Sequence, residues 1–214
     1  MKALLFSVVL ASTVFAQAAL LSYEPGKYKY DGVVLNMTAA INDAKGAPTP
    51  MKMDLLGAGI RSKTVLVATV KVYVLQLFAD NKAGFSRDAN ALASLNSSTR
   101  VALKIDMLRT VSADSLASSL RDAAEANGYE GDAEMANLLT LMSKSAEATQ
   151  GKALTLLMVK KDGKTSVYYE DTKGAMQSFV GSNELSTKIL SIWLGKPADD
   201  GLAALRTTLL KPVY

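Results

Sequence analysis

Residues 55–64 read Leu-Leu-Gly-Ala-Gly-Ile-Arg-Ser-Lys-Thr, and an apolar run from Val65 to Phe78 follows them. The run is rich in valine and leucine, which is typical of a β-strand covered on both faces. Among its few polar residues, Lys71 and Tyr73 are two positions apart, so we expect both to point to one side of the sheet. The sequence predicts a buried strand over this run.

Arg61 lies just upstream of the run, after two glycines that let a backbone turn tightly. A guanidinium beside an apolar strand indicates an anion held at the mouth of an apolar space. The spacing Gly57-x-Gly59 also occurs in dinucleotide-binding loops. Such a loop needs a glycine or alanine where this chain has Ser62, and a helix where it has a strand, so we interpret the glycines as a turn.

The N-terminus has the pattern of an export signal. Lys2 provides the positive charge, a short apolar stretch runs from Ala3 to Val14, and Ala16-Gln17-Ala18 is a cleavage motif. The apolar stretch is too short for a comfortable membrane span; an uncleaved N-terminal anchor is the alternative. We therefore expect residues 1–18 to be a signal peptide, residues 19–214 to form one domain, and the protein to be periplasmic or secreted.

Composition excludes several classes of function. The chain has no cysteine and no histidine, which rules out disulfides, Ser-His-Asp and Cys-His catalysis, and zinc sites built on these residues. The net charge is only +4 and the lysines are not clustered, so nucleic acid is not an expected partner. We expect no metal, no cofactor and no integral membrane segment after signal cleavage.

Periodicity predicts a mixture of strands and helices. Strands are expected over 99–108, 152–160 and 165–170, with Asp162-Gly163 as a type I′ turn. Helices are expected after the caps Ser112, Asp132, Ser182 and Asp199. Strands and helices do not alternate strictly, so the pattern indicates an α+β fold, with a mostly antiparallel sheet and a helical layer on one side.

Three patches resemble the chalcone isomerase family, in its bacterial, chalcone isomerase-like form. The stretch 57–61 resembles the family's Gly-Ala-Gly-Val-Arg motif, residues 70–80 resemble the strand after it, and residues 188–197 (KILSIWLGKP) resemble its C-terminal helix. The resemblance covers about residues 30–212. It implies an open-faced β-sandwich with a ligand cleft between sheet and helices.

The resemblance also implies roles for individual residues. In the family's enzymes the arginine that matches Arg61 meets the polar end of a flavonoid, and in fatty-acid-binding relatives it meets the carboxylate with help from a tyrosine. Tyr73 stands where the enzymes have threonine, and Ser115 and Asp122 fall where they have catalytic tyrosine and asparagine. We therefore expect Arg61, Tyr73 and Lys71 to bind ligand and no residue to be catalytic.

Each of these residues also has a structural interpretation. Arg61 can form an ion pair with a nearby acid, Tyr73 can pack in the core, and Lys71 can extend into solvent. The expected function is that of an exported, non-catalytic protein that binds a fatty acid or similar amphiphile. The alternatives are an isomerase that closes a chalcone-like substrate by intramolecular addition, and a periplasmic structural or partner-binding protein.

Overall fold

The structure, a computed structural model, describes residues 19–42, 51–65 and 67–213. In this part of the chain eight strands form one sheet in which sequence neighbours are also spatial neighbours, and each neighbouring pair is antiparallel. The strands are β1 (Leu21–Tyr30), β2 (Val33–Ile41), β3 (Lys52–Val65), β4 (Ala68–Ala79), β5 (Arg100–Met107), β6 (Ala153–Lys161), β7 (Lys164–Glu170) and β8 (Met176–Ser182). The expected signal peptide lies outside the described residues.

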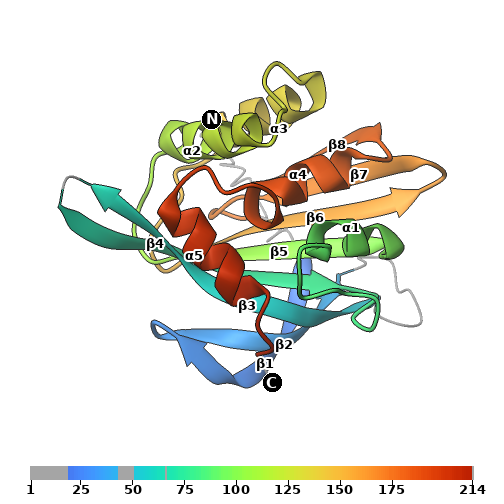
Figure 1. The fold of residues 1–214 in the computed structure, drawn as a ribbon, viewed down its shortest axis with the longest axis horizontal. Helices are drawn as coiled ribbons and strands as arrows, with labels where there is room; N and C mark the ends of the chain where they lie inside the picture. Colours follow the sequence, from blue (N-terminus) through green and yellow to red (C-terminus); the bar gives the residue numbers. More distant parts are fainter. Residues whose placement is uncertain (1–18, 43–50, 66, 214) are drawn as a thin grey trace, which may run out of the picture.

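Helices join and cover the strands on one side of the sheet (Figure 1). They are α1 (Ala91–Ser94), the short 3₁₀ helix η1 (Leu95–Ser97), α2 (Ala113–Ala126), α3 (Ala133–Ser143), α4 (Leu185–Leu194) and α5 (Asp200–Leu209). The expected α+β architecture, an antiparallel sheet with a helical layer, is confirmed. In the part of the chain that the structure describes, every helix is too short or too polar to cross a membrane.

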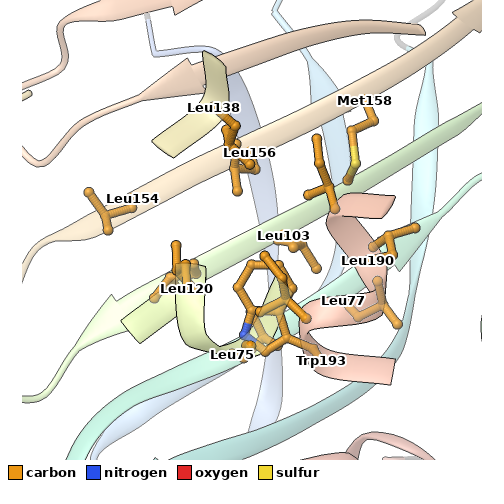
Figure 2. Close-up of a cluster of buried hydrophobic side chains, with 14 of the residues drawn as sticks. Leu75, Leu77, Leu103, Leu120, Leu138, Leu154, Leu156, Met158, Leu190 and Trp193 are labelled. Atoms are coloured by element: carbon orange, nitrogen blue, oxygen red, sulfur yellow. The ribbon is translucent and has the colours of Figure 1, made fainter. Parts of the chain in front are cut away.

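The space between the sheet and the helices is filled by apolar side chains (Figure 2). Alternate residues of the central strands point into it and meet the apolar stripes of α2, α3, α4 and α5. Trp193 of α4 lies among the leucines of β4 and β5 in this layer. This helix-side core holds the helical layer on the sheet.

A second core lies on the opposite face of the sheet. The other set of alternating residues, including Val74 and Phe78 of β4, packs there against Leu35 of β2 and the ring of Tyr23 of β1. The Tyr23 and Phe78 ring centroids are 5.8 Å apart, and the Tyr23 hydroxyl lies 3.4 Å from Thr155 Oγ1 of β6. The β1–β2 hairpin therefore crosses back over the outer face, which makes the sheet an open-faced sandwich.

Local sequence signals placed several elements correctly. Ser112, Asp132 and Asp199 cap α2, α3 and α5 through hydrogen bonds to main-chain amides. Asp162 and Gly163 have φ of 51° and 73°, as a type I′ turn requires. The run that begins at Val65 divides, because β3 ends there and β4 begins at Ala68.

Two predictions were wrong. β8 was not predicted, and Ser182 ends that strand instead of capping α4, which begins at Leu185 after Glu184.

Gly57 and Gly59 do not form a turn; both lie inside β3. A Cβ at Gly57 would overlap the Leu209 carbonyl, and one at Gly59 would overlap Thr208 Oγ1. The glycines are there because α5 lies directly on β3, with its backbone against Gly57 and its side chains against Gly59.

Candidate functional site

Arg61 lies buried near the end of β3, opposite Tyr73 of β4. Its guanidinium faces the N-terminus of α5 and donates two hydrogen bonds to Asp199: Nη1 to Oδ1 at 2.8 Å and Nη2 to Oδ2 at 2.6 Å. Nη1 also donates to the carbonyl of Ser62. The planar fork of arginine suits a carboxylate in this two-pronged arrangement. Arg61 thus already holds a carboxylate, and that carboxylate belongs to the chain itself.

Asp199 has two tasks at this point. Its Oδ1 also accepts the amide of Leu202 at 2.8 Å and so caps α5. Gly201 follows it, and a Cβ there would overlap both the Ser62 carbonyl and Arg61 Nη1. The first turn of α5 is therefore pressed against the arginine, and only glycine fits at position 201.

The ion pair is asymmetric in its exposure to water. The Arg61 side chain is 4% exposed and the Asp199 side chain is 42% exposed. Partial burial alone would raise the pKa of Asp199, but the hydrogen bonds from Arg61 and from the Leu202 amide outweigh it and hold this pKa below its usual range. The carboxylate is therefore ionised at neutral pH, in contact with water on one side and with Arg61 on the other.

Tyr73 points into the helix-side core beside this ion pair. Its hydroxyl accepts a hydrogen bond from Trp193 Nε1 at 3.0 Å, and both side chains are buried. Burial raises the pKa of the Tyr73 phenol, against the smaller opposing effects of Trp193 and Arg61. The phenol is therefore neutral, and it retains a hydrogen that it can donate.

Lys71 does not join Arg61 and Tyr73. The register of β3 and β4 shifts between Arg61 and Ser62, so that Arg61 is opposite Tyr73 but Ser62 is opposite Lys71. This bulge interrupts the alternation of side chains. Lys71 Nζ instead binds Asp31 Oδ1 in the β1–β2 turn at 2.6 Å. The expectation that Lys71 and Tyr73 point to one side was wrong for this reason.

The sequence did not predict which residues contact Arg61 and Tyr73. Asp199 was recognised only as a helix cap and Trp193 only as part of a helical stripe. Both contacts join residues more than a hundred positions apart. The signal that could have indicated the first is the glycine at position 201, two residues after an aspartate, because a small residue in a first helical turn leaves room for a neighbouring side chain.

A family model described as chalcone isomerase-like matches residues 31–210. The chain belongs to the chalcone isomerase-like family. No curated protein matches it. The match includes the helical layer and seven of the eight strands, so the resemblance noted in three short patches extends over the fold except for β1.

Within this chalcone isomerase-like fold, the two residues expected from sequence to match the enzymes' tyrosine and asparagine lie on α2. Ser115 and Asp122 are both exposed there. Ser115 accepts a hydrogen bond from the Ser112 hydroxyl at 2.8 Å, within the first turn of the helix. Neither residue lies in the buried layer that contains Tyr73.

A separate pocket of about 410 Å³ opens between η1, the end of β6 and the start of α4. It is lined by polar side chains: Asn96, Tyr129, Lys160, Asn183, Glu184 and Thr187. Asn96 Oδ1 accepts from Lys160 Nζ at 3.2 Å and from Thr187 Oγ1 at 2.9 Å. Burial lowers the pKa of Lys160. The described residues contain no group of three acidic side chains placed to hold a metal ion.

Proposed function

We propose that this chalcone isomerase-like protein is exported and non-catalytic, and that it binds a fatty acid or similar amphiphilic carboxylate between the sheet and the helices. The proposal depends mainly on one observation: the Arg61 guanidinium is buried at the edge of the apolar layer and holds a carboxylate in two-pronged geometry. A ligand carboxylate would take the place of Asp199 on the same fork. Tyr73 would donate its hydroxyl hydrogen towards the same head group.

The asymmetry of the ion pair makes this exchange feasible. Removing one partner of a buried pair costs about 3–5 kcal/mol because the other charge is left uncompensated. In an exchange, Arg61 never loses its partner, and the partly exposed Asp199 moves into water. Exchanging one carboxylate for another at Arg61 therefore changes the electrostatic free energy little. The affinity has to come from the apolar chain of the ligand.

The apolar chain would occupy the position of the α5 stripe. That stripe consists of Leu202, Leu205 and Leu209, which at about 1.5–3 kcal/mol each contribute roughly 4.5–9 kcal/mol to packing on the sheet. A dozen methylenes at about 0.8 kcal/mol each contribute roughly 10 kcal/mol, so a long chain can compensate for lifting the helix. One charge-assisted hydrogen bond adds only about 1.5–3 kcal/mol. The chain would supply affinity and Arg61 would select the head group.

The groups near Arg61 favour binding over catalysis. An acid–base role requires a group whose pKa lies near the working pH. Burial moves the pKa of Tyr73 upward, away from neutrality, and its hydroxyl accepts the indole N–H of Trp193. Ser115 and Asp122, at the enzymes' positions, are exposed.

The test uses delipidated protein and a fluorescent long-chain fatty acid. Arg61→Met should abolish uptake, whereas Asp199→Asn should tighten it, because it removes the competing charge and keeps a capping side chain. Lys71→Ala is the matched control and should bind like the wild type, since Lys71 pairs with Asp31. If no variant takes up the probe, the binding function is excluded. Ring closure of a chalcone that is lost in Arg61→Met would favour the isomerase instead.

Export has its own test. The proposal rests on the charge, apolar stretch and cleavage motif of residues 1–18. Expression of the full chain in a bacterium, followed by cell fractionation and N-terminal sequencing, should give mature protein that begins near Ala19. Full-length protein in the cytoplasmic fraction would contradict export.

A further inference from the structure

β8 forms one edge of the sheet, with β7 on its inner side. The Asp171 amide donates to the Ala175 carbonyl at the start of this pairing. Hydrogen-bonded pairs alternate in an antiparallel ladder, so the residues of β8 that bond to β7 are Gln177, Phe179 and Gly181. The main-chain groups of Met176, Ser178 and Val180 therefore point away from the sheet.

Ser182 supports this assignment independently. Ser182 lies two positions after Val180 and four after Ser178, so its main-chain groups point the same way as theirs. Its amide donates outward to Glu134 Oε1 of α3 at 2.5 Å. Glu134 thus caps the last outward amide of the strand. Met176, Ser178 and Val180 are exposed, and Val180 is 61% accessible to water.

β8 lacks the features that normally keep a sheet edge from pairing. Its sequence, MQSFVGS, contains no charged residue and no proline. The opposite edge strand, β1, contains Glu24, Pro25, Lys27 and Lys29. Charges and proline on an edge strand discourage pairing with another chain. The β1 edge of the sheet is therefore protected against pairing with another chain, and the β8 edge is free to pair with another strand.

We propose that β8 pairs with β8 of a second copy of this chain, antiparallel about a twofold axis at Ser178. In this register Ser178 faces its own copy, and Met176 faces Val180 of the partner subunit. All three outward residues then form hydrogen-bonded pairs, which gives about six main-chain hydrogen bonds. The strand is uncharged, so the symmetry places no like charges opposite each other, and apolar side chains meet at both ends.

The geometry also limits the strength of this dimer. An edge-to-edge contact of one short strand is small, and interfaces below about 1,200 Å² in total are typically weak or transient. The dimer is therefore concentration-dependent, and it extends the sheet continuously from one subunit into the next.

A cysteine at the axis tests the register directly, because the chain has no cysteine of its own. Paired residues of this type have Cα atoms about 5.5 Å apart, which a disulfide can bridge. Mild oxidation of Ser178→Cys should give a disulfide-linked dimer at least roughly tenfold faster than Val67→Cys, since association raises the local thiol concentration. Val67 is fully exposed in the β3–β4 turn and lies far from β8 in the sheet. Equal rates for the two variants would overturn the proposal.

Sedimentation tests the dimer without cross-linking. The wild type should show a mass that doubles as its concentration rises. Ser178→Pro removes an amide that bonds outward and leaves the β7 ladder intact, and Ser178→Asp places two like charges directly opposite each other on the axis. Both variants should stay monomeric with wild-type circular dichroism. A wild type that is monomeric at every concentration, or a dimer that persists in both variants, would overturn the proposal.

Discussion

Gly57 of β3 lies so close to the main-chain carbonyl of Leu209 on α5 that a side chain at position 57 would overlap it. Gly59, two positions on and therefore on the same face of the strand, lies against the side chains of Thr208 and Leu205. Helices usually pack on sheets through side chains, but at Gly57 the helix backbone itself rests on the strand. The two glycines define where α5 can dock.

Replacing Gly57 by alanine should destabilise the fold, because the new methyl group forces α5 away from β3. Overpacking of this kind costs about 1–3 kcal/mol. We expect the midpoint of urea unfolding to fall accordingly. Thr64→Ala, at an exposed position of the same strand, should change the free energy of unfolding by no more than about 0.5 kcal/mol. A Gly57→Ala variant with the wild-type midpoint would contradict this account of the motif.

The sequence could not have revealed this role. Glycine lowers the stability of a strand interior, so two glycines near each other favour a turn by any local criterion. The feature that keeps them in β3 is a helix about 150 residues further along the chain. Only the tertiary contact distinguishes a turn glycine from one that admits a helix backbone.

Asp199→Asn separates the two tasks of Asp199. Asparagine still caps a helix well, but it cannot neutralise Arg61. We expect a loss of about 1–2 kcal/mol in the free energy of unfolding. This is less than the roughly 3–5 kcal/mol for a fully buried pair, because Asp199 is partly exposed and the asparagine oxygen can still accept a hydrogen bond from Arg61. Asp199→Ala should lose about 1 kcal/mol more, since the cap disappears as well. Equal stability of the two variants would show that the cap contributes nothing.

The same pair should contribute to acid sensitivity. The pKa of Asp199 is lower in the folded state than in the unfolded chain, so its contribution to stability is present above the unfolded pKa and is lost as pH falls through the folded one. The midpoint temperature of thermal unfolding, measured from neutral pH down to pH 3, should therefore fall less steeply for Asp199→Asn than for the wild type. Identical slopes would mean that Asp199 is not the titrating group.

Local signals predicted the fold wherever the structure uses local interactions. Ser112, Asp132 and Asp199 act as caps, and Asp162-Gly163 forms the predicted hairpin turn. β8 was missed because its seven residues show no clean alternation of apolar and polar side chains. The candidate site was harder to predict, since the partners of Arg61 and Tyr73 are separated from them in sequence and a single bulge moves Lys71 away.

Tyr73→Phe should destabilise the protein although it removes only one oxygen. Trp193 Nε1 donates to that hydroxyl inside the core, and without it a buried N–H has no acceptor, at a cost of about 1–3 kcal/mol. Trp193 is the only tryptophan, so its fluorescence reports directly on this contact. The double variant Tyr73→Phe, Trp193→Phe should lose less stability than the sum of the single changes. Strict additivity would show that the hydrogen bond makes no net contribution.

Lys188→Met tests the polar cluster that ties α4 to α3 and β8. Lys188 Nζ lies 2.5 Å from Asp132 Oδ2 and 2.9 Å from Glu134 Oε2, and these contacts, with Asp132 first, raise the pKa of the lysine. Methionine keeps the apolar stem and removes the charge, so unfolding should become easier by about 1.5–3 kcal/mol in urea titrations. Lys63→Met, on an exposed position, is the control and should change little.

The cluster should also appear in the pH dependence of stability. The pKa of Asp132 is low because hydrogen bonds, first from Lys188, outweigh the opposing effect of burial, and that of Glu134 is low through the Ser182 amide and then Lys188. Their contribution is present above the unfolded pKa values and is lost as pH falls through the folded ones. Lys188→Met weakens but does not abolish these depressions, because the main-chain donors remain. The free energy of unfolding of Lys188→Met should therefore fall less between neutral and acidic pH than that of the wild type. The same pH dependence in both proteins would show that other carboxylates cause the acid sensitivity.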